Sequence, residues 1–150
     1  MTDKAVSPVL FARIALGVGF LSAVADRFGL WGPPGATNVA WGDFARFTAY
    51  AGKVNPWAPA ALVPAIAWMA TLAEIALGSL LLVGWRTKWV GLASGVLLLL
   101  FALGMTFGTG VKTAFDASVF AAAAVGFLLY GWPEPSPSEG SSGSGQPRLP

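Results

Sequence analysis

Few side chains in this sequence are suited to chemistry. The 150 residues include no cysteine and no histidine, and only 11% are Asp, Glu, Lys or Arg. Without a thiolate or an imidazole, the chain lacks the usual ligands for zinc, haem and iron–sulfur clusters, so we expect no metal site. It also lacks the side chain that most often acts as a general acid or base. Any chemistry must therefore rest on carboxylates and basic groups, and no catalytic residue can be named.

Two charged residues lie within long apolar segments, Arg13 in the first and Glu74 in the second. A charge at the centre of a bilayer costs about 2.5–3.5 kcal/mol on insertion scales, so such residues are usually paired or functional. At the helical rise, Arg13 and Glu74 lie about 8 and about 15 Å below the same membrane face. We therefore predict an Arg13–Glu74 pair as the leading binding candidate. It is either a clasp between helices or a polar spot that binds a quinone headgroup or passes a proton.

A second polar group gathers near the opposite face of the predicted membrane domain. Asp26 and Arg27 end the first apolar segment, whereas Lys112 and Asp116 begin the last one. Two acids and two bases can neutralise one another there. We predict a salt-bridge network that joins the first and last helices, and the alternative is a small polar cavity that opens to the outside.

Four segments must position these residues. Each has about the 20 mostly apolar residues that a membrane-spanning helix needs, and they cover about 8–30, 59–84, 89–107 and 111–132. The predicted fold class is therefore all-α, an integral membrane four-helix bundle in one domain over residues 1–132. Residues 133–150 are mostly Pro, Ser, Gly and Glu, which predicts a disordered tail.

The connection between the first two segments contains a further helical pattern. Aromatic and small residues recur there at steps of three and four: Trp41, Phe44, Phe47, Thr48 and Ala51. This spacing predicts a short amphipathic helix over about 41–52 that lies in the membrane interface. A loop without membrane contact is the alternative.

The first segment also has a second interpretation. Lys4 and Arg13 precede a short apolar run that ends in Ala23-Val24-Ala25, which is the pattern of a cleavable signal peptide. We favour an uncleaved helix, because Leu30 and Trp31 extend the apolar stretch and four helices make an even bundle.

The third segment carries two pairs of glycines at four-residue spacing. They are Gly91 with Gly95 and Gly104 with Gly108. Small residues at this spacing allow helices to approach closely. The pattern predicts helix packing, either within the bundle or in a homo-oligomer.

Charge indicates orientation only weakly, because basic residues are nearly balanced between the two predicted faces. Arg86 and Lys88 in the very short turn after the second segment favour a cytoplasmic location for that turn and for both termini. A net charge of +2 on so apolar a chain gives no indication of nucleic-acid binding. The expected partners are the lipid bilayer and other membrane proteins or further copies of the chain.

Several stretches resemble the DoxX-like (DoxX/DoxD) family of small bacterial membrane proteins. The resemblance rests on residues 13–17, 23–32, 41–44, 55–57 and 116–120, and above all on Glu74-Ile75-Ala76-Leu77-Gly78 followed by residues 80–84, Leu-Leu-Leu-Val-Gly. It implies a four-helix bundle in a bacterial-type inner membrane. It also implies association with quinone-linked redox assemblies or oxidant-defence complexes.

The missing residue types limit what that resemblance implies. Without cysteine or histidine, thiol chemistry or haem-based electron transfer would require a partner chain. A quinone needs only a pocket and a polar contact, so it is the one redox cofactor that fits this chain alone. We therefore expect an accessory or quinone-proximal subunit. The alternatives are a purely structural membrane subunit and a small-molecule or proton carrier that uses Glu74.

Overall fold

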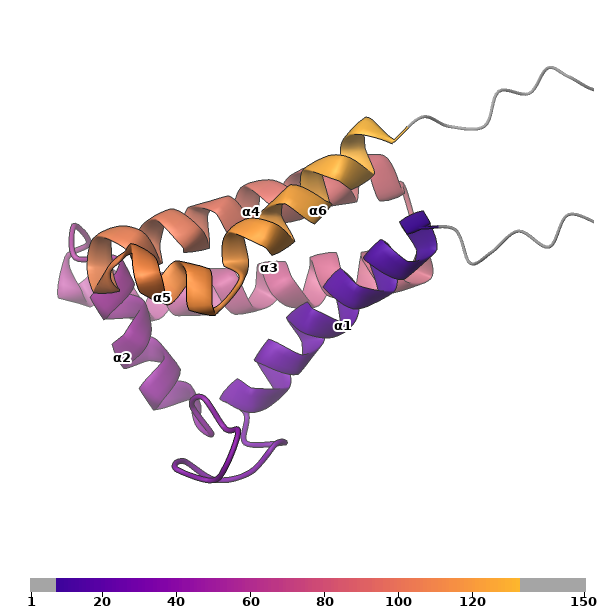
Figure 1. Ribbon diagram of the computed structural model, residues 1–150. Helices are drawn as coiled ribbons and strands as arrows, with labels where there is room; N and C mark the ends of the chain where they lie inside the picture. Colours follow the sequence, from indigo (N-terminus) through magenta and orange to yellow (C-terminus); the bar gives the residue numbers. More distant parts are fainter. Residues whose placement is uncertain (1–7, 133–150) are drawn as a thin grey trace, which may run out of the picture.

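The computed structural model describes residues 8–132, and every regular element in that range is helical (Figure 1). In chain order the elements are α1 (Pro8–Arg27), α2 (Phe44–Val54), the 3-10 turn η1 (Ala60–Leu62), α3 (Val63–Val83), α4 (Thr87–Thr109), α5 (Val111–Asp116) and α6 (Val119–Gly131). The predicted all-helical class is confirmed. The predicted tail, residues 133–150, lies outside the described residues.

Three helices within residues 8–132 are long and apolar enough to cross a membrane. They are α1, the continuous stretch of η1 and α3, and α4. Helix α6 is equally apolar but has only 13 residues. The chain is thus a helical protein with three candidate membrane spans and a shorter apolar helix beside them.

The prediction of one continuous helix over 111–132 is wrong. The helix breaks at Ala117 and Ser118, and Ser118 adopts a left-handed conformation with φ of 54°. A left-handed residue cannot continue a right-handed helix. The break separates α5, which exposes the charged Lys112 and Asp116, from α6, which has no charged residue.

The remaining predicted boundaries differ from the structure by a few residues. Helix α1 stops at Arg27 rather than at residue 30, and α4 is longer than the predicted 89–107. Helix α2 starts at Phe44 because Asp43 caps it, accepting a hydrogen bond from the Arg46 N–H at 2.7 Å. Asp is among the preferred residues at that position.

Helix α1 runs antiparallel to α3 and ends near the middle of α3. Arg27, its last residue, lies opposite Thr71 and Glu74. The loop 28–43 and α2 fill the space that remains beside the first half of α3. Phe47 and Ala51 of α2 form a small core there with Ala67. Figure 1 shows α2 at the end of the bundle away from the α3–α4 turn.

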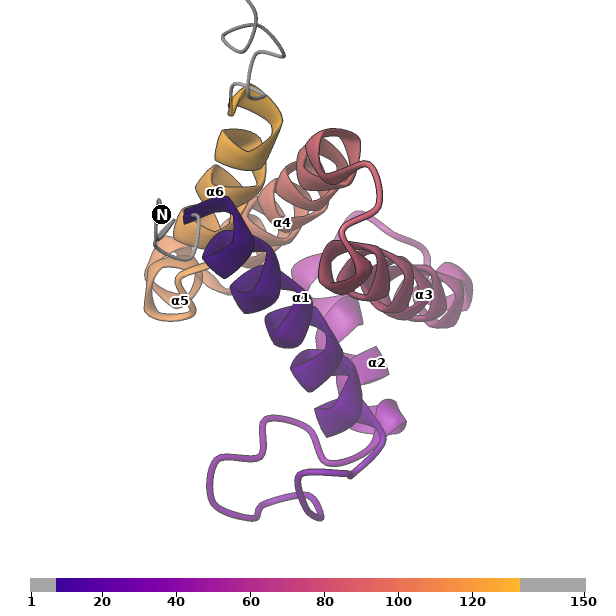
Figure 2. The ribbon, with the colours of Figure 1, turned by 90° about the vertical axis from the view of Figure 1, so that its right-hand side faces the viewer.

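A second core holds the opposite half of the bundle together. It joins α1, α3, α4 and α6 through buried residues that pack against one another: Leu16, Phe20, Leu81, Val90 and Leu129. Helix α1 begins and α6 ends at this end, beside the α3–α4 turn (Figures 1 and 2). The ring centroids of Trp89 and Tyr130, 5.5 Å apart, mark that meeting of α4 and α6.

The four glycines of α4 serve two different neighbours within the chain. A Cβ on Gly91 or Gly95 would lie within 3.1 Å of α6 backbone or side chains, and one on Gly104 would lie 3.0 Å from the Val54 carbonyl oxygen of α2. Gly108 meets the same end of α2. The two glycine pairs therefore place α4 against α6 at one end and against the end of α2 at the other.

Candidate functional site

Glu74 forms its ion pair with Arg27, not with Arg13. The Arg27 Nη1 lies 2.5 Å from Glu74 Oε2, and the two side chains are only 3% and 4% exposed. The predicted Arg13–Glu74 pair does not form because of the register of the two helices. Gly17 packs against Gly78, so Arg13 lies nearer the end of α3 than Glu74 does.

Arg13 instead contacts the carboxyl end of α3. Its Nε donates to the Leu81 carbonyl oxygen at 3.0 Å, and its Nη2 donates to that of Leu82 at 3.4 Å. The last carbonyls of a helix lack intrahelical partners and carry partial negative charge, so they attract a guanidinium. Arg13 therefore caps a helix, and it is not part of the polar site around Glu74.

Arg27 is enclosed on several sides. Its Nη1 also donates to Thr71 Oγ1 at 2.9 Å. The guanidinium carbon lies 3.7 Å from the ring centroid of Phe47 and 5.5 Å from that of Trp41, which are cation–π distances. Within residues 8–132, however, the buried Arg27 Nε has no hydrogen-bond partner. Buried donors are rarely left unpaired, so the Arg27 guanidinium keeps one N–H that the residues around it do not satisfy.

The other three members of the predicted charge network do not join Arg27. Lys112 and Asp116 pair with each other on the surface of α5, with Nζ and Oδ2 2.5 Å apart. Asp26 points to the loop after α1. The predicted network of four is therefore wrong, because adjacent residues on α1 point to different neighbours and α5 turns its charges outward.

Asp26 fixes the loop 28–43 over this end of the bundle. Its carboxylate is buried and accepts three backbone N–H groups, from Ala40 at 2.8 Å, Trp41 at 3.3 Å and Gly42 at 3.1 Å. These hydrogen bonds bring the Trp41 ring to the Arg27 guanidinium. Asp26 is therefore a residue that positions the site rather than one that lines it.

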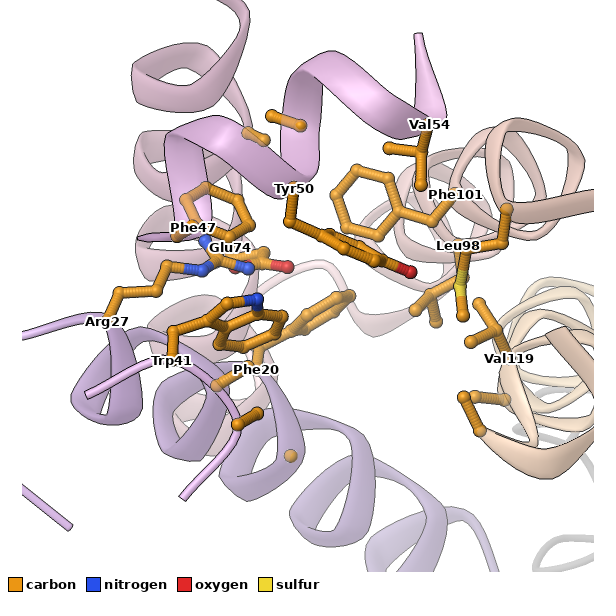
Figure 3. Close-up of a pocket in the computed structure, with 18 of the residues that line it drawn as sticks. Phe20, Arg27, Trp41, Phe47, Tyr50, Val54, Glu74, Leu98, Phe101 and Val119 are labelled. Atoms are coloured by element: carbon orange, nitrogen blue, oxygen red, sulfur yellow. The ribbon is translucent and has the colours of Figure 1, made fainter. Parts of the chain in front are cut away.

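A cavity of about 680 Å³ opens beside the ion pair (Figure 3). It lies between the two cores, and α1, α2, α3, α4 and the α5–α6 break all contribute to its wall. Arg27 and Glu74 form one end, and Leu98 and Val119 lie toward the other (Figure 3). The volume is typical of sites for drug-sized ligands.

The wall of this cavity is mostly apolar and rich in flat rings. Its aromatic members are Phe20, Trp41, Phe47, Tyr50 and Phe101. Figure 3 shows the Tyr50 hydroxyl pointing away from the ion pair, into the space toward Leu98 and Val119. Burial raises the pKa of the Tyr50 hydroxyl, and an interaction with the Thr109 side chain partly offsets this rise. A flat molecule with a polar group at one end matches this distribution of side chains.

Sequence reasoning identified Arg27 and Glu74 but assigned them to different groups. It also missed Thr71, whose hydroxyl both accepts from Arg27 and donates to the Ala67 carbonyl oxygen at 2.8 Å. One signal was present: Thr71 stands three residues before Glu74, which places both on one helix face. No sequence signal pointed to Phe20 or Phe101.

The chain matches no protein-family model, no curated protein and no solved structure. Within residues 8–132, no group of three or more Asp or Glu side chains could hold a metal ion. The function must therefore be argued from the cavity and its ion pair.

Proposed function

We propose that this protein is a multi-pass membrane protein whose cavity holds the head of a lipid-soluble quinone, and that it acts as an accessory subunit of a redox-linked membrane assembly. The observation that carries the proposal is the buried Arg27–Glu74 pair at one end of an aromatic cavity, with Arg27 Nε unpartnered in the described chain. The resemblance to DoxX-like proteins points in the same direction.

The apolar exterior supports insertion into a bilayer. Large apolar side chains are exposed on every candidate span, for example Phe11 at 70%, Leu72 at 58% and Leu100 at 60%. A water-soluble monomer rarely exposes so many large apolar side chains along its long helices. We propose that α5 and α6 together make the fourth crossing. At the helical rise α6 alone is about 20 Å long, which is shorter than a hydrocarbon core of about 30 Å.

The distribution of charge supports an orientation. Arg13, Arg86 and Lys88 lie at the α3–α4 end of the described chain, where no acidic side chain accompanies them. The opposite end carries both signs, including Asp43, Arg46 and the α5 pair. The positive-inside rule counts Lys and Arg, which are nearly balanced between the two ends, so the orientation rests on Arg86 and Lys88 in the very short α3–α4 turn. We therefore place that turn and both chain ends on the cytoplasmic side of a bacterial-type inner membrane.

The residues present suit a quinone head. When bound, a quinone supplies a carrier of two electrons and two protons within the lipid phase. Its ring matches the flat aromatic walls, and its carbonyl oxygens are acceptors that suit the guanidinium of Arg27 at one end of the cavity. Glu74 balances the charge of the Arg27 guanidinium, so an uncharged quinone head suits the site. Because the chain has no cysteine or histidine, the electron donor or acceptor is a partner protein.

The test is to measure quinone that co-purifies with the protein in mild detergent. In the double variant Arg27→Met with Glu74→Leu, both charges are replaced by apolar groups, a change that buried pairs often tolerate. We expect this variant to stay folded and to lose the quinone from its lipid extract. The single variant Glu74→Gln, which leaves Arg27 without its counter-charge, should also lose it.

The matched control is Lys112→Met with Asp116→Leu, the same chemical change at the exposed pair of α5. This variant should retain the quinone at the wild-type ratio. Full retention by the Arg27/Glu74 double variant would refute the proposal and leave the pair as a helix clasp. Mass spectrometry of the same preparation identifies the redox partner.

A further inference from the structure

The cavity has a buried floor and an exposed rim. Phe20, Phe47 and Glu74 on the floor are 4%, 6% and 3% exposed. The exposed lining residues are all small: Ala15 and Gly19 on α1, Ala117 at the α5–α6 break and Ala40 in the loop. The polar end is therefore enclosed, and the open part of the wall consists of residues with almost no side chain.

The α1 side of this rim lies at the depth of the hydrocarbon core. Gly19 stands near the middle of α1, about 12 Å of helical rise before Arg27. Its neighbours on the outer surface of α1 are apolar, including Ile14 and Val18, which are 44% and 53% exposed. An opening bordered by Ala15 and Gly19 therefore faces lipid tails rather than water.

The opposite side of the rim is the break between α5 and α6. Ala117, Val119 and Ala122 line the cavity there, and α6 begins at Val119, where the preceding Ser118 makes no side-chain cap hydrogen bond. Broken helices at membrane depth are tolerated where they line a cavity, because their free backbone groups need partners. The break thus belongs to the cavity wall.

Gly19 has open space in front of it. A Cβ built on this residue meets no atom within 4 Å, whereas one on Gly17, half a turn earlier, would meet Leu82 at 2.9 Å. Gly17 is needed for packing against α3, but Gly19 is not. The absence of a side chain at residue 19 leaves the rim wide on the α1 side.

We infer that the cavity takes a tailed molecule, with its polar head at Arg27 and its alkyl or prenyl tail leaving sideways between α1 and the α5–α6 break into the bilayer. A cavity of about 680 Å³ holds a ring and a short chain but not a long prenyl tail. Gly19 then determines specificity for the tail. This inference rests on the proposed function, because it assigns the route and the tail of the same ligand.

The experiment compares two benzoquinones in phosphatidylcholine nanodiscs, one without a tail (2,3-dimethoxy-5-methyl-1,4-benzoquinone) and its 6-decyl derivative. Binding is measured by tryptophan quenching, corrected for partition into empty nanodiscs. The chain has no cysteine, so thiol adducts do not interfere. Gly19→Leu narrows the rim. We expect this variant to bind the decyl compound at least about tenfold more weakly, and its affinity for the tail-less compound to change by less than about twofold.

The matched control is Gly131→Leu, because Gly131 also has open space around it but lies at the end of α6, outside the cavity lining. It should alter neither affinity. Equal effects of Gly19→Leu on both compounds, or none on either, would overturn the inference and favour access beside Ala40. If neither compound binds the wild-type protein, the proposed function fails together with the inference.

A second measurement does not depend on the Leu variant. Gly19→Cys gives the chain a single thiol for a fluorophore. Lipids with a nitroxide in the acyl chain should quench this fluorophore, and the decyl compound should protect it. Leu100→Cys, on the lipid-facing side of α4, should be quenched without protection. Quenching of the Gly19 label by aqueous iodide alone would mean that the rim faces water, contrary to the inference.

Discussion

Arg27–Glu74 and Lys112–Asp116 are ion pairs of the same length in opposite surroundings. In each, nitrogen and oxygen lie 2.5 Å apart. The side chains of the first pair are 3% and 4% exposed, and those of the second are 85% and 63% exposed. The first pair joins α1 to α3, whereas the second joins residues one turn apart on α5. Distance alone does not distinguish a pair that holds helices together from a pair that water could replace.

The difference teaches where a charge matters in this protein. Exposed pairs at this helical spacing contribute about 0.3–0.5 kcal/mol, because water and salt compete with the partner. In a buried pair the loss of one partner strands the other charge, which costs about 3–5 kcal/mol. We expect losses of stability between these two energies for changes to the carboxylate of Asp26 and the guanidinium of Arg13.

The largest effect is expected at the buried pair. Glu74→Ala should lower the free energy of unfolding by about 3–5 kcal/mol, because Arg27 would keep its charge without a counter-ion. Unfolding by denaturing detergent measures the loss. The comparison variant is Lys112→Ala, which breaks the exposed pair and should lose only about 0.3–0.5 kcal/mol. Equal losses in the two variants would show that burial does not separate the pairs.

The second largest effect is expected at Asp26. Asp26→Asn keeps one acceptor oxygen but loses the charge and one of the two oxygens that accept the three backbone N–H groups, and a hydrogen bond to a charged group contributes about 1.5–3 kcal/mol. We expect faster hydrogen exchange at residues 40–42. Asp43→Asn is the control, because Asn caps a helix as well as Asp does and should leave exchange unchanged. Unaltered exchange in Asp26→Asn would mean that the loop is held by other contacts.

A third prediction separates Arg13 from the buried site. Arg13→Gln should cost about 1 kcal/mol, because it removes hydrogen bonds to two carbonyls at the end of α3. Its effect and that of Glu74→Ala should add within about 0.5 kcal/mol, as expected for residues without shared contacts. A coupling energy well above that would restore the Arg13–Glu74 pair expected from the sequence.

The smallest effect is expected on the surface of α5. Asp116→Ala should change the free energy of unfolding by no more than about 0.5 kcal/mol, and the difference should vanish at high salt. A salt titration of the unfolding midpoint measures this. A loss that persists at high salt would mean that α5 carries its charges in a less exposed setting, such as against a partner.

Much of the fold followed from local pattern. Long apolar runs gave α1, α3 and α4 within a few residues, and the aromatic spacing gave α2. The break in the fourth segment was missed because Ser118 takes a left-handed conformation, which its residue type does not demand. Among the site residues, Glu74 was recognised from its charge in an apolar run. Its partner was not, since Arg13 and Arg27 lie on the same helix and only the register against α3 separates them.

The sequence by itself determined that the chain is helical, apolar and dependent on very few charges for any chemistry. Composition and periodicity are properties of short stretches, so they can be read without the fold. The tertiary structure decided that Arg27 meets Glu74, that Asp26 holds the loop and that α4 packs against both α2 and α6. These contacts join residues far apart in the chain, and helix register and the length at which α1 stops determine them. The cavity is a consequence of that packing, because it is the space that α1, by ending opposite the middle of α3, leaves between the two cores.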